Sequence, residues 1–277
     1  MKTLRSIRNW AFKLGAIVIL LSMAREEDVA LKPNEYRVIP NTSFFRGEVI
    51  DYKVHYGFVN AAEAQMVIHD DLHDINGRQC YKIDVHGKSI GMFDLFLRIR
   101  DNWGTYLDTA SIVPQKFYQK IEEGKYRKHE IVDFDHENEQ VNVHNYHFKR
   151  KEWKPIEKFE VPQYAQDIVS GYYYLRTIDF KSLKENQIID LKAFFDDEVF
   201  DFKIRFIGRD EVKTKLGVIR SVVISPIMPE NSLFDGENSI RVWISDDRNK
   251  VPLKIKAEMF VGSVEVDIQS YSQGKIK

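Results

Sequence analysis

Apolar and polar residues alternate with a period of two through most of the chain between residues 50 and 268, and this pattern constrains the fold more than any other feature. Successive side chains of a β-strand point to opposite faces of its sheet, so the alternation predicts strands with one buried and one solvent-exposed face. The clearest apolar sets cover residues 50–56, 62–68, 81–85, 95–99, 189–195, 200–206, 240–244, 253–257 and 264–268. Together with shorter sets they predict about a dozen strands.

Short polar segments between these sets predict tight turns. Asn76-Gly77 is a pair that two-residue hairpins prefer, because both turn positions need a positive φ. The residues around Asp196-Asp197 separate the two strands of the clearest hairpin, and Glu123-Gly124 separates another pair. Residues 69–74 are expected to form a solvated loop, and residues 246–249 a hairpin turn, since Asp and Asn tolerate turn geometry.

One segment departs from the strand pattern. Ile168, Tyr172 and Leu175 recur at helical spacing, which predicts a helix over about residues 165–178, entered after Pro162. Gly171 inside that helix costs about 1 kcal/mol relative to alanine, so we expect it to mark a close packing contact.

The order of these elements limits the fold class. Strands do not alternate regularly with helices, so a parallel α/β sheet is excluded. A long antiparallel meander has to protect its edges, and it does so by closing into a barrel or by folding into two packed sheets. We therefore expect a mainly β protein in which the meander forms a curved, partly open barrel with one main helix, the alternative being two packed sheets.

Residues 1–24 have the composition of a signal peptide. Four Lys and Arg precede the apolar run from Leu14 to Leu21, and Ser22-Met23-Ala24 approximates a cleavage site. An uncleaved membrane anchor is the alternative, although the uncharged run is shorter than the ~20 residues that a span needs. Residues 25–46 lack periodicity and are predicted to be a linker or extended arm, and residues 47–277 a single β-rich domain. No stable transmembrane segment is expected after cleavage.

Charge and cysteine content narrow the classes of partner. Without residues 1–24 the chain keeps 37 Lys and Arg against 42 Asp and Glu, a formal charge of −5. Nucleic acid is therefore not an expected partner, because neutralising phosphates needs a basic surface. Cys80 is the single cysteine, so the chain forms no internal disulfide.

Three stretches carry a likeness to a known family. They are GEVIDYKVHYGFVNAAEA at 47–64, QDIVSGYYYLR at 166–176 and VWISDDRNKVPLKIKAEMFVGSVEVDI at 242–268. In this order they resemble a bacterial exported family that is catalogued as domain of unknown function 3108; Ala62 departs from the glycine expected there. The resemblance implies a Gram-negative origin, export and a β-rich domain, and it brings no assigned activity and no catalytic residues.

Candidate catalytic and metal-binding residues lack the spacing that their chemistry needs. His69 and His73 would share a face only in a helix, and His144 and His147 point to opposite faces of a strand. The acidic segments 133–137 and 246–249 lack the spacing of a calcium loop. Ser170 lacks a nucleophile-elbow setting. We expect no enzyme activity, no catalytic residues, no metal and no cofactor.

The predicted helix offers the candidate ligand-binding residues. Asp167, Tyr172, Tyr173 and Arg176 place polar groups on an aromatic surface that could line a cavity, and Trp243 on a later strand joins this set. The alternative is that the tyrosines pack against the sheet. A basic run at residues 149–158, which includes Trp153, could contact anionic lipid headgroups or form a solvated loop.

These observations favour an exported, periplasmic, non-enzymatic protein of the cell envelope. The first hypothesis is that it binds or carries a lipid or another apolar small molecule inside the curved sheet. The first alternative is a structural or assembly factor that binds an envelope protein, and the second is a hydrolase whose residues meet only in the fold. The alternative to a periplasmic location is secretion of the protein from the cell.

Overall fold

The computed structural model of the 277-residue chain describes residues 36–227, 239–260 and 262–273. The predicted signal peptide and residues 25–35 of the predicted arm lie outside the described residues. Contacts between residues define one compact unit from Arg37 to Lys277. Among the described residues, no helix has both the length and the apolar character needed to cross a membrane.

The compact unit is built on one antiparallel sheet, in which most neighbouring strands are consecutive along the chain. Its strands are β1 (Val49–Tyr56), β2 (Val59–Ile75), β3 (Arg78–Ser89), β4 (Arg100–Asp108), β5 (Pro114–Glu123), β6 (Tyr126–Asp135), β7 (Gln140–His147), β8 (Glu152–Trp153), β9 (Glu157–Glu160), β10 (Ile188–Phe195), β11 (Glu198–Thr214), β12 (Gly217–Pro226), β13 (Ile240–Ser245), β14 (Pro252–Glu258) and β15 (Ser263–Ser272). The helices are α2 (Gly91–Phe96) and α3 (Ile168–Leu175).

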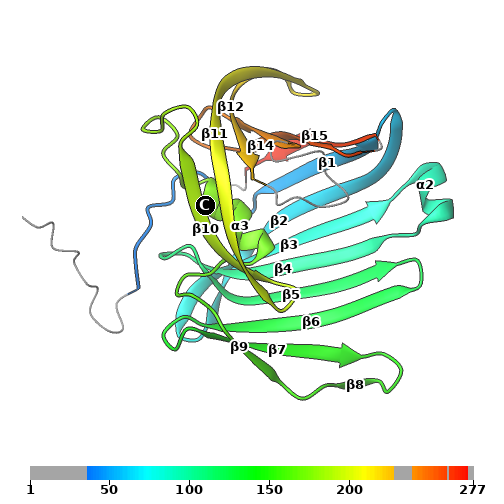
Figure 1. Cartoon of the computed structure of the whole chain (residues 1–277), viewed down its shortest axis with the longest axis vertical. Helices are drawn as coiled ribbons and strands as arrows, with labels where there is room; N and C mark the ends of the chain where they lie inside the picture. The colour runs from blue at the N-terminus through cyan, green and yellow to red at the C-terminus, as the bar shows by residue number, and fades with distance from the viewer. Residues whose placement is uncertain (1–35, 228–238, 261, 274–277) are drawn as a thin grey trace, which may run out of the picture. The chain divides into compact units, whose positions relative to one another are not determined.

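The order of the strands shows how the sheet is assembled. It runs β10 to β15 and then β1 to β8, with β9 paired to β7, so the last strand of the chain pairs with the first. The sheet does not close, because β10 at one end does not pair with β8 or β9 at the other. Figure 1 shows β1 to β7 as one curved layer with α3 beside it. The predicted mainly β, partly open barrel is confirmed.

Two predicted hairpin turns are present with the backbone geometry expected for them. Asn76 and Gly77 have φ values of 55° and 72°, and they connect β2 to β3. Asp196 and Asp197, with φ values of 49° and 63°, connect β10 to β11. Positive φ at both positions matches the right-handed twist of the flanking strands, which is why such turns join hairpins.

Two local predictions were wrong. Residues 95–99 were expected to form a strand, but Leu95 lies in α2, where its side chain is 84% exposed. The alternating apolar residues there do not mark a buried face. Residues 69–74 were expected to form a loop, but they continue β2 to Ile75. After an irregularity between Ile68 and Leu72, the residues from Leu72 onward pair with β3. Hairpin pairing holds this polar segment as a strand beyond the core.

The predicted main helix is confirmed as α3, although it is shorter than residues 165–178. Asp167 caps it by accepting hydrogen bonds from the backbone N–H groups of Val169 and Ser170, and the Ser170 hydroxyl accepts from the Asp167 N–H. This capping box satisfies backbone groups that would otherwise be left without partners in the interior. Gly171 is buried, and a Cβ there would lie 3.4 Å from the Leu191 side chain in β10.

The largest core cluster lies on the face of the sheet that packs against α3. It contains Ile50, Ile68 and Ile83 from β1 to β3, and Val169 and Tyr173 from the helix. Burial of such side chains contributes roughly 1.5–3 kcal/mol each. The arm also contributes, since Phe44 is fully buried in this cluster and the Ile39 N–H donates to the Ala110 carbonyl. The compact unit thus includes the residues just before Gly47.

Gly104 in β4 supports the outer face of the sheet, and its substitution should be costly. Tyr118 is its partner on β5, and a Cβ at Gly104 would overlap the Tyr118 ring, whose hydroxyl donates to Asp84 at 2.6 Å. We expect Gly104→Ala to lower the free energy of unfolding by about 2 kcal/mol, because the ring must move. Urea unfolding measures this change.

Gly87 provides the matched control for this substitution. It also lies inside a strand with an ordinary φ, but the nearest heavy atom to a Cβ at this position would be Trp103 Cζ3 at 3.9 Å. Gly87→Ala should therefore change the free energy of unfolding by less than about 0.5 kcal/mol. Equal effects of the two substitutions would show that the Tyr118 ring does not require a glycine beneath it.

Candidate functional site

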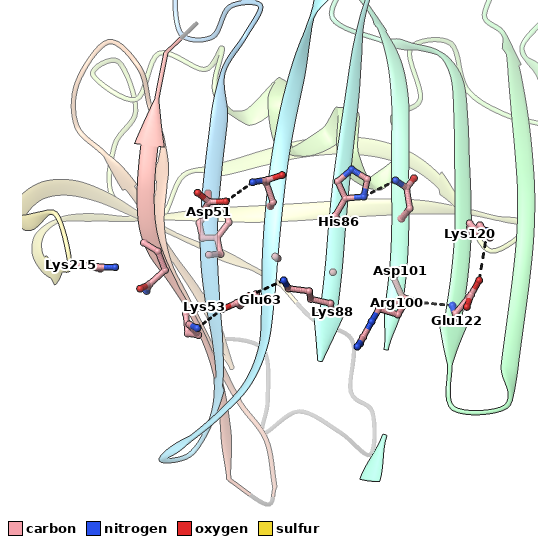
Figure 2. A pocket seen from close by; sticks show the side chains of 16 residues that line it. Asp51, Lys53, Glu63, His86, Lys88, Arg100, Asp101, Lys120, Glu122 and Lys215 are labelled. Carbon is pink, nitrogen blue, oxygen red and sulfur yellow. Dashed lines mark hydrogen bonds and ion pairs between the residues drawn. The ribbon is translucent and has the colours of Figure 1, made fainter. Parts of the chain in front are cut away.

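A groove of about 700 Å³ crosses β1 to β5 on the face of the sheet opposite α3 (Figure 2). The face follows from alternation: the Tyr52 hydroxyl reaches the Tyr172 hydroxyl of α3, so the neighbouring Asp51 and Lys53 side chains point the other way. Lys215, from the turn between β11 and β12, also lines the groove.

Strand register sorts the groove side chains into two parallel rows. One row holds Asp51, Gln65, His86, Asn102 and Lys120, and the other holds Lys53, Glu63, Lys88, Arg100 and Glu122. Because residues two apart on a strand lie roughly 6.6–6.8 Å apart, the backbone between the rows forms a narrow floor. The groove is therefore a trough that runs across the strands.

A hydrogen-bond network holds one wall of the trough in place. The Asn102 side-chain amide donates to His86 Nδ1 at 2.9 Å and lies 3.4 Å from Asp84 Oδ1. The buried Asp84 carboxylate also accepts from the Tyr118 hydroxyl and contacts His69 Nε2 at 2.6 Å. Burial would raise the pKa of Asp84, but these hydrogen bonds and Lys82 outweigh it, so its pKa lies below the usual value.

The other wall carries charges of both signs, in the order Lys53, Glu63, Lys88, Arg100 and Glu122, so that Lys88 and Arg100 are neighbours of like charge. Glu63 lies between two ammonium groups, with Lys53 Nζ at 2.7 Å and Lys88 Nζ at 3.2 Å. Arg100 pairs with Asp94 of α2 at 2.7 Å. The Lys88 side chain is 58% exposed, so it stays accessible to a molecule in the trough.

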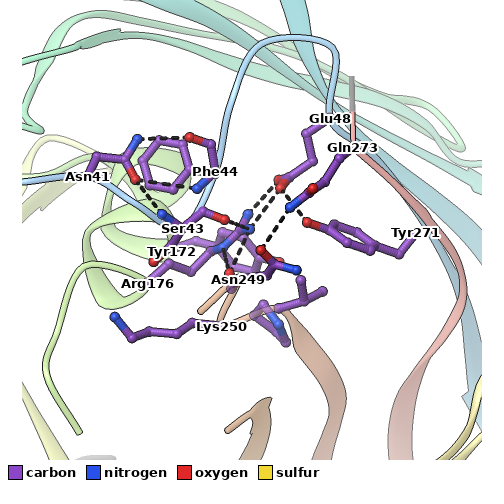
Figure 3. Close-up of polar contacts among 12 residues, drawn as sticks. Asn41, Ser43, Phe44, Glu48, Tyr172, Arg176, Asn249, Lys250, Tyr271 and Gln273 are labelled. Carbon is purple, nitrogen blue, oxygen red and sulfur yellow. Dashed lines mark hydrogen bonds and ion pairs between the residues drawn. The ribbon is translucent and has the colours of Figure 1, made fainter. Parts of the chain in front are cut away.

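The candidate ligand-binding residues of the helix lie elsewhere, in the interior. Arg176 is fully buried at the end of α3, where its guanidinium donates to both Glu48 carboxylate oxygens at 2.5 and 2.8 Å (Figure 3). It also donates to the backbone carbonyls of Ser43 and Asn249. The helix end is thereby tied to the arm, to the residue preceding β1 and to the β13–β14 connection.

The other three helix residues also make internal contacts. The Tyr172 and Tyr52 hydroxyls lie 2.9 Å apart. The fully buried Tyr173 ring packs against the Phe44 ring, with 4.8 Å between the ring centroids. The Thr105 hydroxyl donates to Asp167 Oδ2 at 2.7 Å. Desolvation dominates there and raises the pKa of Asp167 to about 6.

None of the five candidate residues lines the trough. Four of them meet at α3, and Trp243 lies on β13, where its indole N–H donates to Asp210 Oδ2 at 3.1 Å. The contacts of the four fix the helix against the sheet, as in the packing alternative. Ligand binding by these residues stays a prediction.

The histidines and acidic segments considered for metal binding are separated in the fold. His69 contacts Asp84, and His73 stacks edge-on against Tyr106. His144 pairs with Asp133 at 3.1 Å. Residues 246–249 form the predicted turn, in which Asp247 Oδ1 accepts from backbone N–H groups. The described part of the chain brings together no group of three or more metal-ligating side chains.

A second surface feature lies at the end of the sheet where the β1–β2, β3–β4, β5–β6 and β7–β8 connections meet. We call it the rim, and it consists of the exposed apolar residues Tyr56, Phe58, Val59, Met92, Leu95, Phe96, Leu97, Tyr126, Phe148, Trp153, Ile156 and Phe260. Figure 1 shows these connections following one another along one side of the sheet. Phe58 is 107% exposed, so its whole ring projects into solvent.

The rim is held together by backbone contacts between its loops. The Gly57 N–H donates to the Ser263 carbonyl, and the Ile90 N–H donates to the Ala61 carbonyl. The Gly124 N–H donates to the Arg98 carbonyl at 2.8 Å. Each of these loops is thus anchored to a neighbour, and the apolar side chains follow one edge.

Basic residues surround this apolar edge. Residues 88–100, 122–128 and 147–158 contain 11 Lys and Arg against 5 Asp and Glu, whereas the chain as a whole has a formal charge of −1. These three segments of the rim therefore carry a net positive charge on a chain that is slightly acidic as a whole. Exposed aromatic and aliphatic side chains with Lys and Arg beside them are typical of surfaces that bind lipid headgroup regions.

Sequence reasoning found part of this rim and missed the rest. The basic run with Trp153 was recognised as a possible lipid contact. The segment GMFDLFL at 91–97 was assigned in part to a strand because its apolar residues alternate, which concealed the fact that they face solvent. The trough was missed because its walls come from five strands whose register no local pattern specifies.

Comparisons with known proteins agree with the fold. No curated protein matches the chain. A β-barrel-like protein from Brucella abortus, of the domain of unknown function DUF1849, matches with a TM-score of 0.51 and 12% identity over 87% of this chain and 100% of that chain. At this identity the match shows the fold alone.

Two other solved structures show weaker likeness. One is a Bacteroides fragilis protein described as having a YmcC-like fold, with a TM-score of 0.34 and 6% identity. The other is a Parabacteroides distasonis protein described as a lipoprotein, with a TM-score of 0.31 and 9% identity. Each match covers 86% of this chain and 100% of the other.

The family resemblance read from the sequence is confirmed over most of the chain. Residues 51–269 match the family described as protein of unknown function (DUF3108), from the beginning of β1 to the last part of β15. This range includes the trough, α3 and the rim. The chain therefore belongs to the DUF3108 family of proteins of unknown function.

Proposed function

We propose that this chain is a non-enzymatic, exported protein of the bacterial cell envelope that binds an anionic lipid surface through the rim. The observation that carries the proposal is the row of exposed apolar side chains at one end of the sheet, bordered by an excess of Lys and Arg. Export to the periplasm rests on the composition of residues 1–24.

Two physical terms favour a lipid surface as the occupant. Large apolar side chains that leave water for the interfacial region gain free energy roughly in proportion to the area buried. Each Lys or Arg near an anionic surface adds about 1 kcal/mol, which salt screens. The basic residues of the rim, such as Lys149, Arg150 and Lys151, are placed to contribute this second term.

The rim is also a better location for a lipid contact than the interior of the sheet. In the described residues, the face of the sheet beside α3 is filled by Tyr173, Phe44 and the Arg176–Glu48 pair. An acyl chain at this place would have to displace packed side chains and the Arg176–Glu48 pair, which is strongly unfavourable. We therefore place the lipid contact at the outer end of the sheet.

Vesicle flotation with residues 25–277 tests the proposal. We expect binding to phosphatidylcholine vesicles that contain phosphatidylglycerol, weakened by salt, and much less binding to phosphatidylcholine alone. The triple variant Phe58→Ser, Leu95→Ser, Phe96→Ser should lower partitioning by at least about tenfold, since about 1.4 kcal/mol is less than one fully buried side chain provides. Lys149→Gln, Arg150→Gln, Lys151→Gln should weaken the preference for phosphatidylglycerol, because each basic residue near the surface adds about 1 kcal/mol.

The control places the same chemical change at another loop. Leu216 and Val218, at the β11–β12 turn, are also exposed but lie outside the rim. Leu216→Ser, Val218→Ser should leave partitioning unchanged. The proposal is wrong if the parent protein binds neither kind of vesicle. It is also wrong if the triple variant of the rim binds as well as the parent protein. Binding of an envelope protein to the rim would then support the alternative that this chain is an assembly factor.

A further inference from the structure

We infer that the trough on the outer face of the sheet binds a phosphate ester that also carries a primary amine, the chemistry of an ethanolamine phosphodiester. The trough is lined by five Lys and Arg residues and by four Asp and Glu residues. The trough adjoins the rim, since Lys88 and Arg100 line it and also belong to the basic residues beside the rim, but its test needs no membrane.

The presence of both signs of charge along one wall defines the class of ligand. Glu63 on β2 stands directly beside Lys88 on β3, and its other neighbour is Lys53 on β1. A purely anionic ligand in the trough would approach Glu63 and Glu122, and a purely cationic one would approach Lys53 and Lys88. A ligand with both charges can place each opposite its counterpart.

The spacing of the strands fits such a ligand. Glu63 and Lys88 face each other on neighbouring strands, with Lys88 Nζ 3.2 Å from Glu63 Oε2, so opposite charges lie a few ångström apart on this wall. The two-carbon arm between the phosphate and the amine of ethanolamine phosphate spans a comparable distance. Its ammonium can donate to the Glu63 carboxylate while its phosphate oxygens accept from the Lys88 ammonium.

The opposite wall supplies neutral donors in fixed positions. His86 lies beside Lys88 in β3, separated from it by Gly87. Because Nδ1 of His86 accepts from the Asn102 amide, the neutral ring carries its proton on Nε2, which becomes a donor toward the trough. Asn102 is itself held by Asp84. This wall is organised before any ligand arrives, which reduces the entropic cost of binding.

Soluble headgroups test the inference directly. Residues 25–277 are titrated by NMR with glycerophosphoethanolamine, glycerophosphocholine and glycerophosphoglycerol. We expect a millimolar dissociation constant for the first, as befits a small ligand in an open groove, with amide shifts in β2 to β4. The choline compound cannot donate a hydrogen bond from its nitrogen, and the glycerol compound has no amine, so both should bind at least about fivefold more weakly.

Matched variants locate the site. Glu63→Gln and Lys88→Gln should each weaken binding of glycerophosphoethanolamine by about fivefold. Lys116 and Asp133 form a comparable cross-strand pair at 3.0 Å outside the trough, so Lys116→Gln should have no effect. Equal binding of the three headgroups, no saturation, or equal effects of all three variants would overturn the inference.

A second experiment distinguishes the two possible sources of the ligand, a lipid headgroup and a soluble diester. Vesicles of phosphatidylcholine with phosphatidylethanolamine, free of anionic lipid, are compared with free glycerophosphoethanolamine. Vesicle binding that Lys88→Gln removes identifies the lipid headgroup as the source, and binding of the free compound alone identifies a soluble diester. The proposal for the rim is tested separately, by binding to vesicles that contain phosphatidylglycerol. Either proposal can therefore be contradicted without the other.

Discussion

Arg176→Met should lower the free energy of unfolding by about 3–5 kcal/mol, the largest effect that we expect from one substitution. The change leaves the Glu48 carboxylate buried without its bidentate partner, and it removes the donors that reach the Ser43 and Asn249 carbonyls. An uncompensated buried charge is the reason for the size of the effect. Urea unfolding followed by circular dichroism measures it.

Two further variants separate the buried charge from simple loss of packing. Arg150→Met removes an arginine that is 72% exposed, and it should change the free energy of unfolding by less than about 0.5 kcal/mol. Adding Glu48→Leu to Arg176→Met should restore much of the lost stability, because no charge then remains buried. If the double variant is as unstable as the sum of its parts, the pair does not act as a unit.

Asp167→Asn should stabilise the protein at pH 7 and have little effect at pH 4. Burial raises the pKa of Asp167 to about 6 in the folded protein, against 3.8 for the free side chain. The difference between these two pKa values corresponds to roughly 3 kcal/mol between the two protonation states. Asparagine is as good a helix cap as aspartate, so the substitution keeps the cap and removes the buried charge.

The sign follows from proton linkage. The folded state holds the Asp167 proton more tightly, so its stabilising contribution is complete below pH 3.8 and is lost as the pH rises through 6. His136 acts in the opposite direction, because burial lowers its pKa to about 4 and stability falls as the pH drops from 6.5. The parent protein's own profile is therefore the sum of opposing contributions.

Comparing the variant with the parent at each pH isolates Asp167 from His136. The difference in the free energy of unfolding between Asp167→Asn and the parent should grow from near zero at pH 4 to its full value by pH 7. Thr105→Val, which removes only the hydroxyl that donates to Asp167, serves as a control that keeps the carboxyl group. A constant difference across this pH range would show that Asp167 titrates normally.

The proposals for the rim and the trough concern neighbouring parts of one sheet. Lys88 and Arg100 line the trough at the ends of β3 and β4 that lead into α2, whose side chains belong to the rim. A lipid surface held by the rim would bring headgroups close to the trough. The tests above nevertheless keep them apart, because each uses a ligand that the other site does not require.

The sequence by itself determined the class of fold and most of its elements. Period-two alternation specifies strands because it places every apolar side chain of a segment on one face, and turn pairs such as Asn76-Gly77 specify which strands form hairpins. Helical spacing around Ile168 and Tyr172 likewise located α3. These are local properties, so neighbouring residues along the chain were enough to reveal them.

Only the tertiary structure decided where the ends of the meander meet and which polar groups share a site. Pairing of β15 with β1 joins segments that lie at opposite ends of the described chain, and no local pattern encodes it. The trough depends on the register of five strands, and Arg176 reaches Glu48 only when α3 packs against the assembled sheet. Whether an alternating apolar segment such as Leu95–Leu97 is buried or exposed is also settled by packing, because burial belongs to the assembled sheet.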